Sequence, residues 1–192
     1  MRICLVNAHP DPAPERFCHA LAAAYQSGAE EAGHTVDRFD AGALDYGFLE
    51  SAAAFDAAPP DAFKAVREAL SAADHFVFIY PLWLGTLPAK SKAFLEHLGR
   101  AHFFLDTQND SSKWPAQKMN GKSARVIVTM GMPGFAYRLF FGSHSVKGLE
   151  AGILKLSGFS PVKDSVFGLV EAGPERRAAL LDEARKLGAA GR

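Results

Sequence analysis

The segment Ala73-Asp74-His75-Phe76-Val77-Phe78-Ile79-Tyr80 and the turn after it, Pro81-Leu82-Trp83-Leu84-Gly85, decide the fold. The apolar run 76–80 is typical of a strand buried on both faces of a parallel sheet. A Pro-aromatic-Gly turn ends this run, and a helical segment begins at Leu87-Pro88. Open α/β sheets bind ligands just beyond the carboxyl ends of their strands. Because Trp83 is flat and apolar and the turn carries backbone amides, we expect this turn to contact a planar heteroaromatic ligand.

Short β-rich runs alternate with amphipathic helical segments, which predicts an α/β fold with a parallel sheet covered on both faces. The expected strands are Arg2–Asn7, His34–Asp40, Asp74–Tyr80, Ala124–Thr129 and Pro161–Gly168. The expected helices are Glu15–Gly33, Asp61–Ala73, Pro88–Arg100, Ser145–Gly158 and Pro174–Leu187. The segments Ala41–Pro60, His102–Gly121 and Met130–Phe141 are expected to be irregular.

Five strands at this spacing fit a flavodoxin-like three-layer sandwich with the strand order 2-1-3-4-5, whose ligand lies between strands one and three. A six-stranded dinucleotide fold would need more chain. It would also need a Gly-x-Gly-x-x-Gly turn after the first strand, and none is present there. The length of 192 residues fits one domain over residues 1–192.

Composition argues against several functional classes. The 21 basic and 21 acidic residues give a formal net charge of zero, which does not favour binding to nucleic acid or to anionic lipid. Cys4 and Cys18 make neither a disulfide framework nor a metal site. No apolar run is long enough for a transmembrane segment. The start Met1–Val6 lacks the layout of a signal peptide, so we expect a cytoplasmic protein.

The turn after the first strand, from Asn7 to His19, opens a helix. Free amides at the start of a helix attract phosphate, and His9 and Arg16 add hydrogen-bond donors. The turn is not a Walker loop, because it lacks Gly-Lys-Ser/Thr. The alternative is a proline-stiffened loop whose charged side chains face water.

This turn also carries a family resemblance. Ala8-His9-Pro10-Asp11-Pro12, followed by Phe17 and a helix, resembles the flavin-dependent NAD(P)H:quinone oxidoreductases of flavodoxin-like fold. That group includes mammalian quinone reductases, bacterial modulator-of-drug-activity-type proteins and the ancillary subunits of glutathione-gated potassium efflux systems. The segment 81–85 with Pro88-Ala89 resembles the family's second flavin segment. Thr129-Met130-Gly131, with Tyr137 and His144, resembles the third, and the three segments occur in family order.

The resemblance implies FMN or FAD, bound non-covalently, and NAD(P)H as co-substrate. It implies that the flavin phosphate contacts His9, Arg16, Phe17 and Cys18. It further implies that Pro81, Leu82, Trp83 and Leu84 line the isoalloxazine ring, and that Thr129, Met130 and Gly131 contact its pyrimidine side. The chain departs from the family pattern in two places. Cys18 replaces a frequent asparagine, and Thr-Met-Gly-Met replaces Thr-Thr-Gly-Gly at residues 129–132.

By the same resemblance, Tyr137 and His144 assist when hydride reaches the flavin and then leaves for a quinone. Tyr O–H and His N–H donors stabilise the negative charge of a reduced flavin, and histidine can supply a proton near neutral pH. Three alternatives stay open from the residues alone. Tyr137 can be a surface aromatic, His144 can be a residue at the start of a helix, and Trp83 can belong to the core.

The expected activity is the two-electron reduction of a quinone-like acceptor by ping-pong hydride transfer. The alternative is a flavin-binding ancillary subunit of a membrane transporter. A flavodoxin-type electron carrier is disfavoured, because such carriers are usually strongly acidic and this chain is neutral. An apolar cluster stands beside Tyr137, made of Phe135, Leu139, Phe140 and Phe141. It can roof the substrate pocket, form the interface of a homodimer, which the resemblance favours, or make peripheral contact with a membrane.

Overall fold

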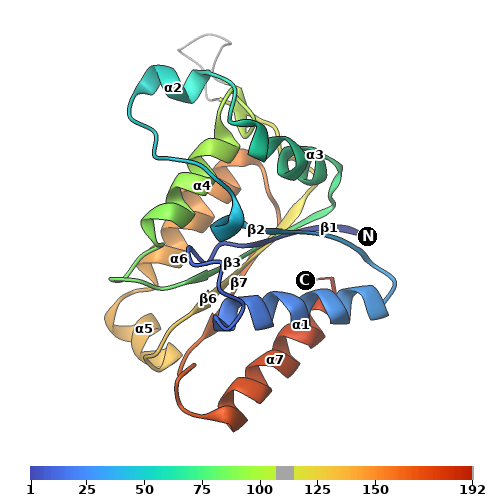
Figure 1. Ribbon diagram of the computed structural model, residues 1–192, viewed down its shortest axis with the longest axis vertical. Coiled ribbons are helices and arrows are strands. Elements are labelled where there is room, and N and C mark those ends of the chain that lie inside the picture. Colours follow the sequence, from blue (N-terminus) through green and yellow to red (C-terminus); the bar gives the residue numbers. More distant parts are fainter. Residues whose placement is uncertain (107–114, 192) are drawn as a thin grey trace.

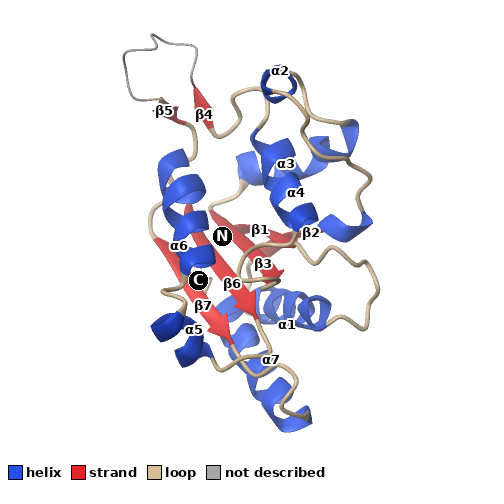
Figure 2. Ribbon diagram, turned by 90° about the vertical axis from the view of Figure 1, so that its left-hand side faces the viewer, coloured by secondary structure: helices blue, strands red, loops and turns tan. Residues whose placement is uncertain are grey.

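The computed structural model describes residues 1–106 and 115–191. A five-stranded parallel sheet in the order β2-β1-β3-β6-β7 forms its centre, which confirms the flavodoxin-like strand order (Figure 2). The strands are β1 (Arg2–Asn7), β2 (Thr35–Asp40), β3 (His75–Pro81), β6 (Ser123–Thr129) and β7 (Val162–Phe167). Each boundary lies within one residue of the expected position.

Helices cover both faces of the sheet (Figure 1). One face carries α1 (Phe17–Glu31) and α7 (Pro174–Ala189), and the other carries α3 (Lys64–Ala72), α4 (Ala89–Gly99) and α6 (His144–Leu149). The central strand β3 divides its side chains between two cores because successive residues of a strand point to opposite faces. Phe76, Phe78 and Tyr80 pack under α3, α4 and α6, whereas Val77 and Ile79 pack under α1 and α7.

Helices α1 and α7 pack backbone against backbone. A Cβ atom placed on Gly28 of α1 would overlap the carbonyl oxygen of Arg185, and one on Gly188 of α7 would overlap the carbonyl oxygen of Tyr25. Glycine is therefore required at both contact points. The loop between β1 and α1 and the loop between β7 and α7 both lie at the carboxyl edge of the sheet. The contact between the two helices therefore fixes these two loops relative to each other.

Three segments differ from the sequence-based expectation. The expected loop 130–141 contains the short helix α5 (Gly134–Phe140). The carbonyl of Pro133 accepts hydrogen bonds from the amides of Ala136 and Tyr137 and so begins the helix. The sequence Pro-Gly at this start does not resemble a helix, which is why the sequence pattern did not predict it. The irregular connection 41–60 contains η1 (Ala41–Ala43) and α2 (Ala52–Asp56). The expected continuous helix 145–158 begins as α6 and continues as the π-helical segment η3 (Glu150–Lys155).

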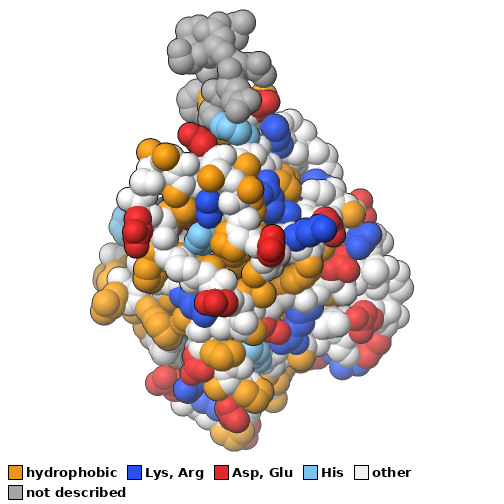
Figure 3. All heavy atoms as spheres, turned by 45° about the horizontal axis from the view of Figure 1, so that its top comes forward, with side chains coloured by type: hydrophobic (Ala, Val, Ile, Leu, Met, Phe, Trp, Pro, Cys, Tyr) orange, Lys and Arg blue, Asp and Glu red, His pale blue; other side chains and the backbone are white. Residues whose placement is uncertain are grey.

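The remaining elements are small. The expected helix 61–73 begins with the 3-10 turn η2 (Asp61–Phe63). The two-residue strands β4 (Leu105–Asp106) and β5 (Ala116–Gln117) pair within the expected irregular segment 102–121, of which residues 107–114 lie outside the described residues. Within the described part of the chain, no helix combines the length and the apolar character needed to cross a membrane. Figure 3 shows acidic and basic side chains interspersed over one face.

Candidate active site

A cleft of about 260 Å³ lies beyond the carboxyl ends of β1, β3 and β6. This is the switch point of the sheet, where the strand order reverses and ligands of such folds bind. The cleft brings together residues from all three segments that the sequence singled out. Its lining residues are His9, Phe17, Cys18, Pro81, Leu82, Trp83, Thr129, Met130, Gly131, Val170 and Glu171. Four expected site residues are not in this lining, namely Arg16, Leu84, Tyr137 and His144.

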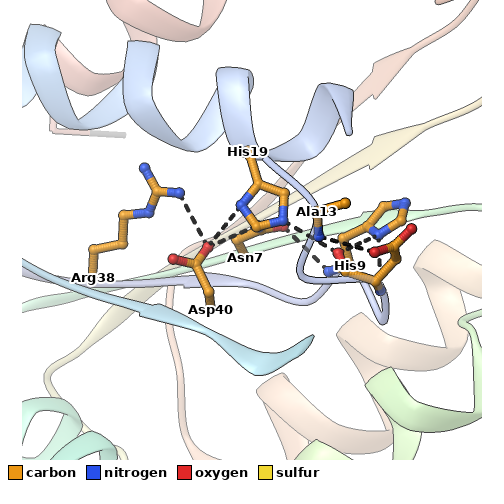
Figure 4. Close-up of polar contacts among 7 residues, drawn as sticks. Asn7, His9, Ala13, His19, Arg38 and Asp40 are labelled. Carbon is orange, nitrogen blue, oxygen red and sulfur yellow. Dashed lines mark hydrogen bonds and ion pairs between the residues drawn. The ribbon is translucent and has the colours of Figure 1, made fainter. Parts of the chain in front are cut away.

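The loop between β1 and α1 forms the first wall. The Nδ1 atom of His9 lies 3.1 Å from both the backbone nitrogen and the carbonyl oxygen of Asp11. The amide of Ala13 donates to Oδ1 of Asp11 at 2.9 Å, which closes the turn (Figure 4). Burial lowers the pKa of His9 despite the opposing contact with the Asp11 backbone. The neutral imidazole is therefore favoured near pH 7.

Arg16 differs from the expectation. Its Nε donates to Oδ2 of Asp11 at 2.6 Å, so its charge is paired outside the cleft lining. The Ala13 amide and the Arg16 guanidinium together lower the pKa of Asp11. Phe17 and Cys18 are the first two residues of α1, and both line the cleft. Amides in the first turn of a helix have no intrahelical partner and attract phosphate, so these two residues offer the donors expected of this loop.

A polar network behind this wall holds the ends of β1 and β2 against α1 (Figure 4). Nδ2 of Asn7 donates to Oδ1 of Asp40 at 2.8 Å, and Nη2 of Arg38 donates to the same oxygen at 3.1 Å. Nδ1 of His19 lies 3.4 Å from that oxygen. Sequence reasoning gave His19 no role. The sequence signal that could have found this network was Asp40, which ends β2 beside Asn7 at the end of β1.

The turn after β3 forms the second wall. Trp83 and Thr86 exchange two backbone hydrogen bonds of 3.0 Å, and Leu84 and Gly85 between them have φ values of +48° and +82°. Positive φ at both central positions is typical of a tight type I′ turn. Trp83 is 49% exposed, so the core alternative for it is wrong. Its ring meets the ring of His9 edge-on, with the two ring centroids 5.9 Å apart. Leu84 is fully exposed beside the cleft.

Two backbone amides of this turn are already engaged. The amide of Leu82 donates to the carbonyl of Thr129 at 2.8 Å, and the amide of Trp83 donates to Thr86. The turn therefore offers the cleft mainly the apolar surfaces of Pro81, Leu82 and Trp83.

The segment after β6 forms the third wall. Oγ1 of Thr129 lies 3.5 Å from Sγ of Cys18, and burial raises the pKa of that thiol to about 12. Met130 is 5% exposed and contributes to the core, while its amide donates to the carbonyl of Phe167 at 3.0 Å. Gly131 faces a carboxylate, because a Cβ atom placed on it would lie 3.7 Å from Oε2 of Glu171.

The expected catalytic pair lies outside this cleft lining. Tyr137 is 1% exposed, and its hydroxyl oxygen accepts from the amide of Val146 at 3.4 Å, so the surface alternative for Tyr137 is wrong. His144 is exposed and is the first residue of α6. It lines a second groove of about 700 Å³, which also includes Thr86 and Leu87. The turn 83–86 therefore contributes Trp83 to the cleft and Thr86 to the groove.

Sequence reasoning missed two lining residues, Val170 and Glu171. They belong to the loop after β7, and the rule that ligands bind beyond the carboxyl ends of strands could have found them. The loop carries no motif, which is why residue types alone did not single it out.

Comparison with models of protein families identifies the family of this chain. A model described as flavodoxin-like fold matches residues 1–189. The chain belongs to this family. The resemblance that the sequence carries is thereby confirmed. A comparison with curated protein sequences gave no match.

Solved structures share the fold along the whole chain. The protein Smu.1420 of Streptococcus mutans is 28% identical with a TM-score of 0.81, and the match covers 99% of this chain and 100% of that one. An NAD(P)H:quinone oxidoreductase of Methanothermobacter marburgensis is 21% identical with a TM-score of 0.83, covering 100% and 99%. An FMN-dependent NADH-azoreductase of Bacillus anthracis, solved with FMN, is 13% identical with a TM-score of 0.73, covering 98% and 97%.

Proposed function

We propose that this protein is a flavin-dependent NAD(P)H oxidoreductase that reduces quinones or similar acceptors by two electrons. The observation that carries the proposal is the cleft itself. The cleft lies at the switch point of the sheet, and both the first turn of α1 and the half-exposed Trp83 line it. Similar solved structures named as a quinone oxidoreductase and an FMN-dependent azoreductase support the same class of activity.

The lining residues fit a flavin. Pro81, Leu82 and Trp83 offer an apolar wall for a planar ring, and the start of α1 offers amides for a phosphate. Flavin phosphate would rely on these amides, because the described lining residues include neither lysine nor arginine. Both FMN and FAD present such a phosphate. A bound flavin would supply the redox chemistry, accepting hydride from NAD(P)H and passing two electrons to the acceptor in ping-pong order.

We assign separate roles to Tyr137 and His144. The Tyr137 hydroxyl binds the amide of Val146, two residues after His144, so Tyr137 holds the first turn of α6. Exposed His144 can hold or donate a proton at its imidazole on the groove side of the turn 83–86. Tyr137 is then a positioning residue, and His144 is the proton donor to the acceptor.

We further propose that the protein forms a homodimer whose interface buries the apolar cluster beside Tyr137. Phe135, Leu139 and Phe140 are each more than 70% exposed, and Phe141 is 46% exposed. Soluble monomers rarely leave a contiguous apolar patch of this kind uncovered. The mass of the protein in solution tests the assignment. We expect twice the 20.7 kDa chain mass for the natural sequence and the single-chain mass for the double variant Leu139→Glu, Phe140→Glu.

The experiment that tests the function is an anaerobic titration of FMN- or FAD-reconstituted protein with NADH and with NADPH, followed by visible absorption. We expect the flavin band to bleach and to recover when a quinone is added. Flavin that binds but does not bleach would favour the ancillary-subunit alternative, and protein that binds no flavin would overturn the proposal. Trp83→Ala should weaken flavin binding, whereas Phe48→Ala, an exposed aromatic outside the cleft, should not.

A further inference from the structure

The described lining of the cleft holds one acidic side chain and neither lysine nor arginine. The acidic residue is Glu171. The nearby Arg16 is paired with Asp11, and burial favours the neutral form of His9. The charged side chain that the described lining presents to a ligand is therefore a carboxylate.

Backbone hydrogen bonds hold the two residues that precede Glu171 on the strand side of the loop. The amide of Leu169 donates to the carbonyl of Met132 at 3.1 Å, and the amide of Val170 donates to the carbonyl of Met130 at 3.3 Å. These bonds tie the loop after β7 to the segment after β6. The carboxylate of Glu171 is exposed and lies beside Gly131, 3.7 Å from a Cβ atom placed there, and it lines the cleft.

Two arginines hold the same loop from the α7 side. Arg176 donates to the carbonyl of Gly168 from both Nε and Nη2, and Nε of Arg177 donates to the carbonyl of Val170 at 2.8 Å. The Arg177 guanidinium lies 5.9 Å from the ring centroid of Phe17. Both guanidinium groups thus bind the loop carbonyls, and neither arginine belongs to the cleft lining.

We infer that Glu171 lowers the reduction potential of a flavin bound in this cleft. The inference rests on the proposed function, because it needs flavin in the cleft. Hydride transfer moves one proton and two electrons from NAD(P)H to a neutral oxidised flavin. It leaves NAD(P)⁺ and a reduced flavin with one additional negative charge. A carboxylate lining the cleft repels that charge, so it weakens binding of the reduced form relative to the oxidised form.

A lower potential makes the bound flavin a stronger reductant toward its acceptor. It also makes the uptake of hydride from NAD(P)H less favourable by the same factor. Glu171 therefore adjusts the balance between the two halves of the reaction without touching the transferred hydrogen.

The test is the midpoint potential of bound FMN, measured by equilibration with a reference dye in the natural protein and in Glu171→Gln. We expect the variant to bind the reduced form about tenfold more tightly relative to the oxidised form, which for a two-electron couple is a rise of about 30 mV. The phosphate of FMN is present in both redox states. Its own repulsion from Glu171 therefore cancels in the potential, although it affects the dissociation constant.

Glu175→Gln is the matched control. Glu175 is an exposed glutamate in the first turn of α7, and it does not line the cleft. We expect a shift in Glu171→Gln that shrinks at high salt, with little shift in Glu175→Gln. An unchanged potential in Glu171→Gln, or equal shifts in both variants, would overturn the inference while leaving the proposed function standing. Failure of the natural protein to bind FMN and FAD would overturn both.

Discussion

The Sγ atom of Cys18 lies 3.5 Å from the Oγ1 atom of Thr129, which ties the first turn of α1 to the carboxyl end of β6. The contact also places a thiol in the lining of the cleft, where its chemistry matters.

We predict that this thiol is inert in the folded protein. Burial raises the pKa of Cys18 to about 12, and burial raises the pKa of Cys4 to about 12 as well. Thiolates are the reactive species, so neither cysteine should react with iodoacetamide at pH 8 until the chain unfolds. Mass spectrometry after short pulses at increasing urea concentration measures this. Alkylation of Cys18 in native protein would contradict the prediction.

The glycine contact between α1 and α7 gives a second prediction. Gly28→Ala should lower the free energy of unfolding by about 1–3 kcal/mol, because the added methyl meets the backbone of Arg185 and the helices must separate. Gly148→Ala is the matched control, since it lies in a helix with no atom within 4 Å of the added Cβ. That substitution should raise stability by about 0.5–1 kcal/mol through helix propensity. Urea denaturation distinguishes the two signs.

A third prediction concerns pH. Burial, with the nearby charges of Arg125 and Lys163, lowers the pKa of His75 from 6.5 to about 4. Between these values the unfolded chain binds the proton and the folded chain does not. Stability is therefore retained above pH 6.5 and lost as the pH falls toward 4, with a slope of up to about 1.4 kcal/mol per pH unit.

His75→Gln should flatten this slope, and Phe48→Ala, which changes an exposed residue that does not titrate, should leave it in place. Urea denaturation at several pH values measures the free energy of unfolding for each variant. Carboxylates add the same pH dependence to every curve, so the contribution of His75 is the difference in slope between variants. Equal slopes in His75→Gln and the natural protein would contradict the assignment.

A fourth prediction separates the two roles considered for Tyr137. Tyr137→Phe removes the acceptor for the amide of Val146 and should cost about 1 kcal/mol of stability. If Tyr137 only positions α6, stopped-flow measurement should show the rate of flavin reduction falling less than the rate of quinone reduction. A large fall in flavin reduction at unchanged stability would instead support direct catalysis by Tyr137.

The sheet was predictable because each strand carries its own signal. The run 76–80 is apolar throughout, and its neighbours read as short β-rich segments between helices. The position of the cleft was predictable from the topology, because the parallel strands β1, β3 and β6 all end at the same edge of the sheet. Helix α5 was not predictable from periodicity, because it is short and begins with Pro133 and Gly134. The pairing of Arg16 with Asp11 was equally hidden, because both residues suit a phosphate site when read singly.

The packing of α1 against α7 also orders events during synthesis. A chain made from its amino end completes α1 and the strands beneath it early, but the side of α1 that packs against α7 stays uncovered until α7 has left the ribosome. Glu171 and Val170 emerge just before α7, so the cleft has no complete lining until then. A ligand can therefore meet the complete cleft only when nearly the whole chain has been made.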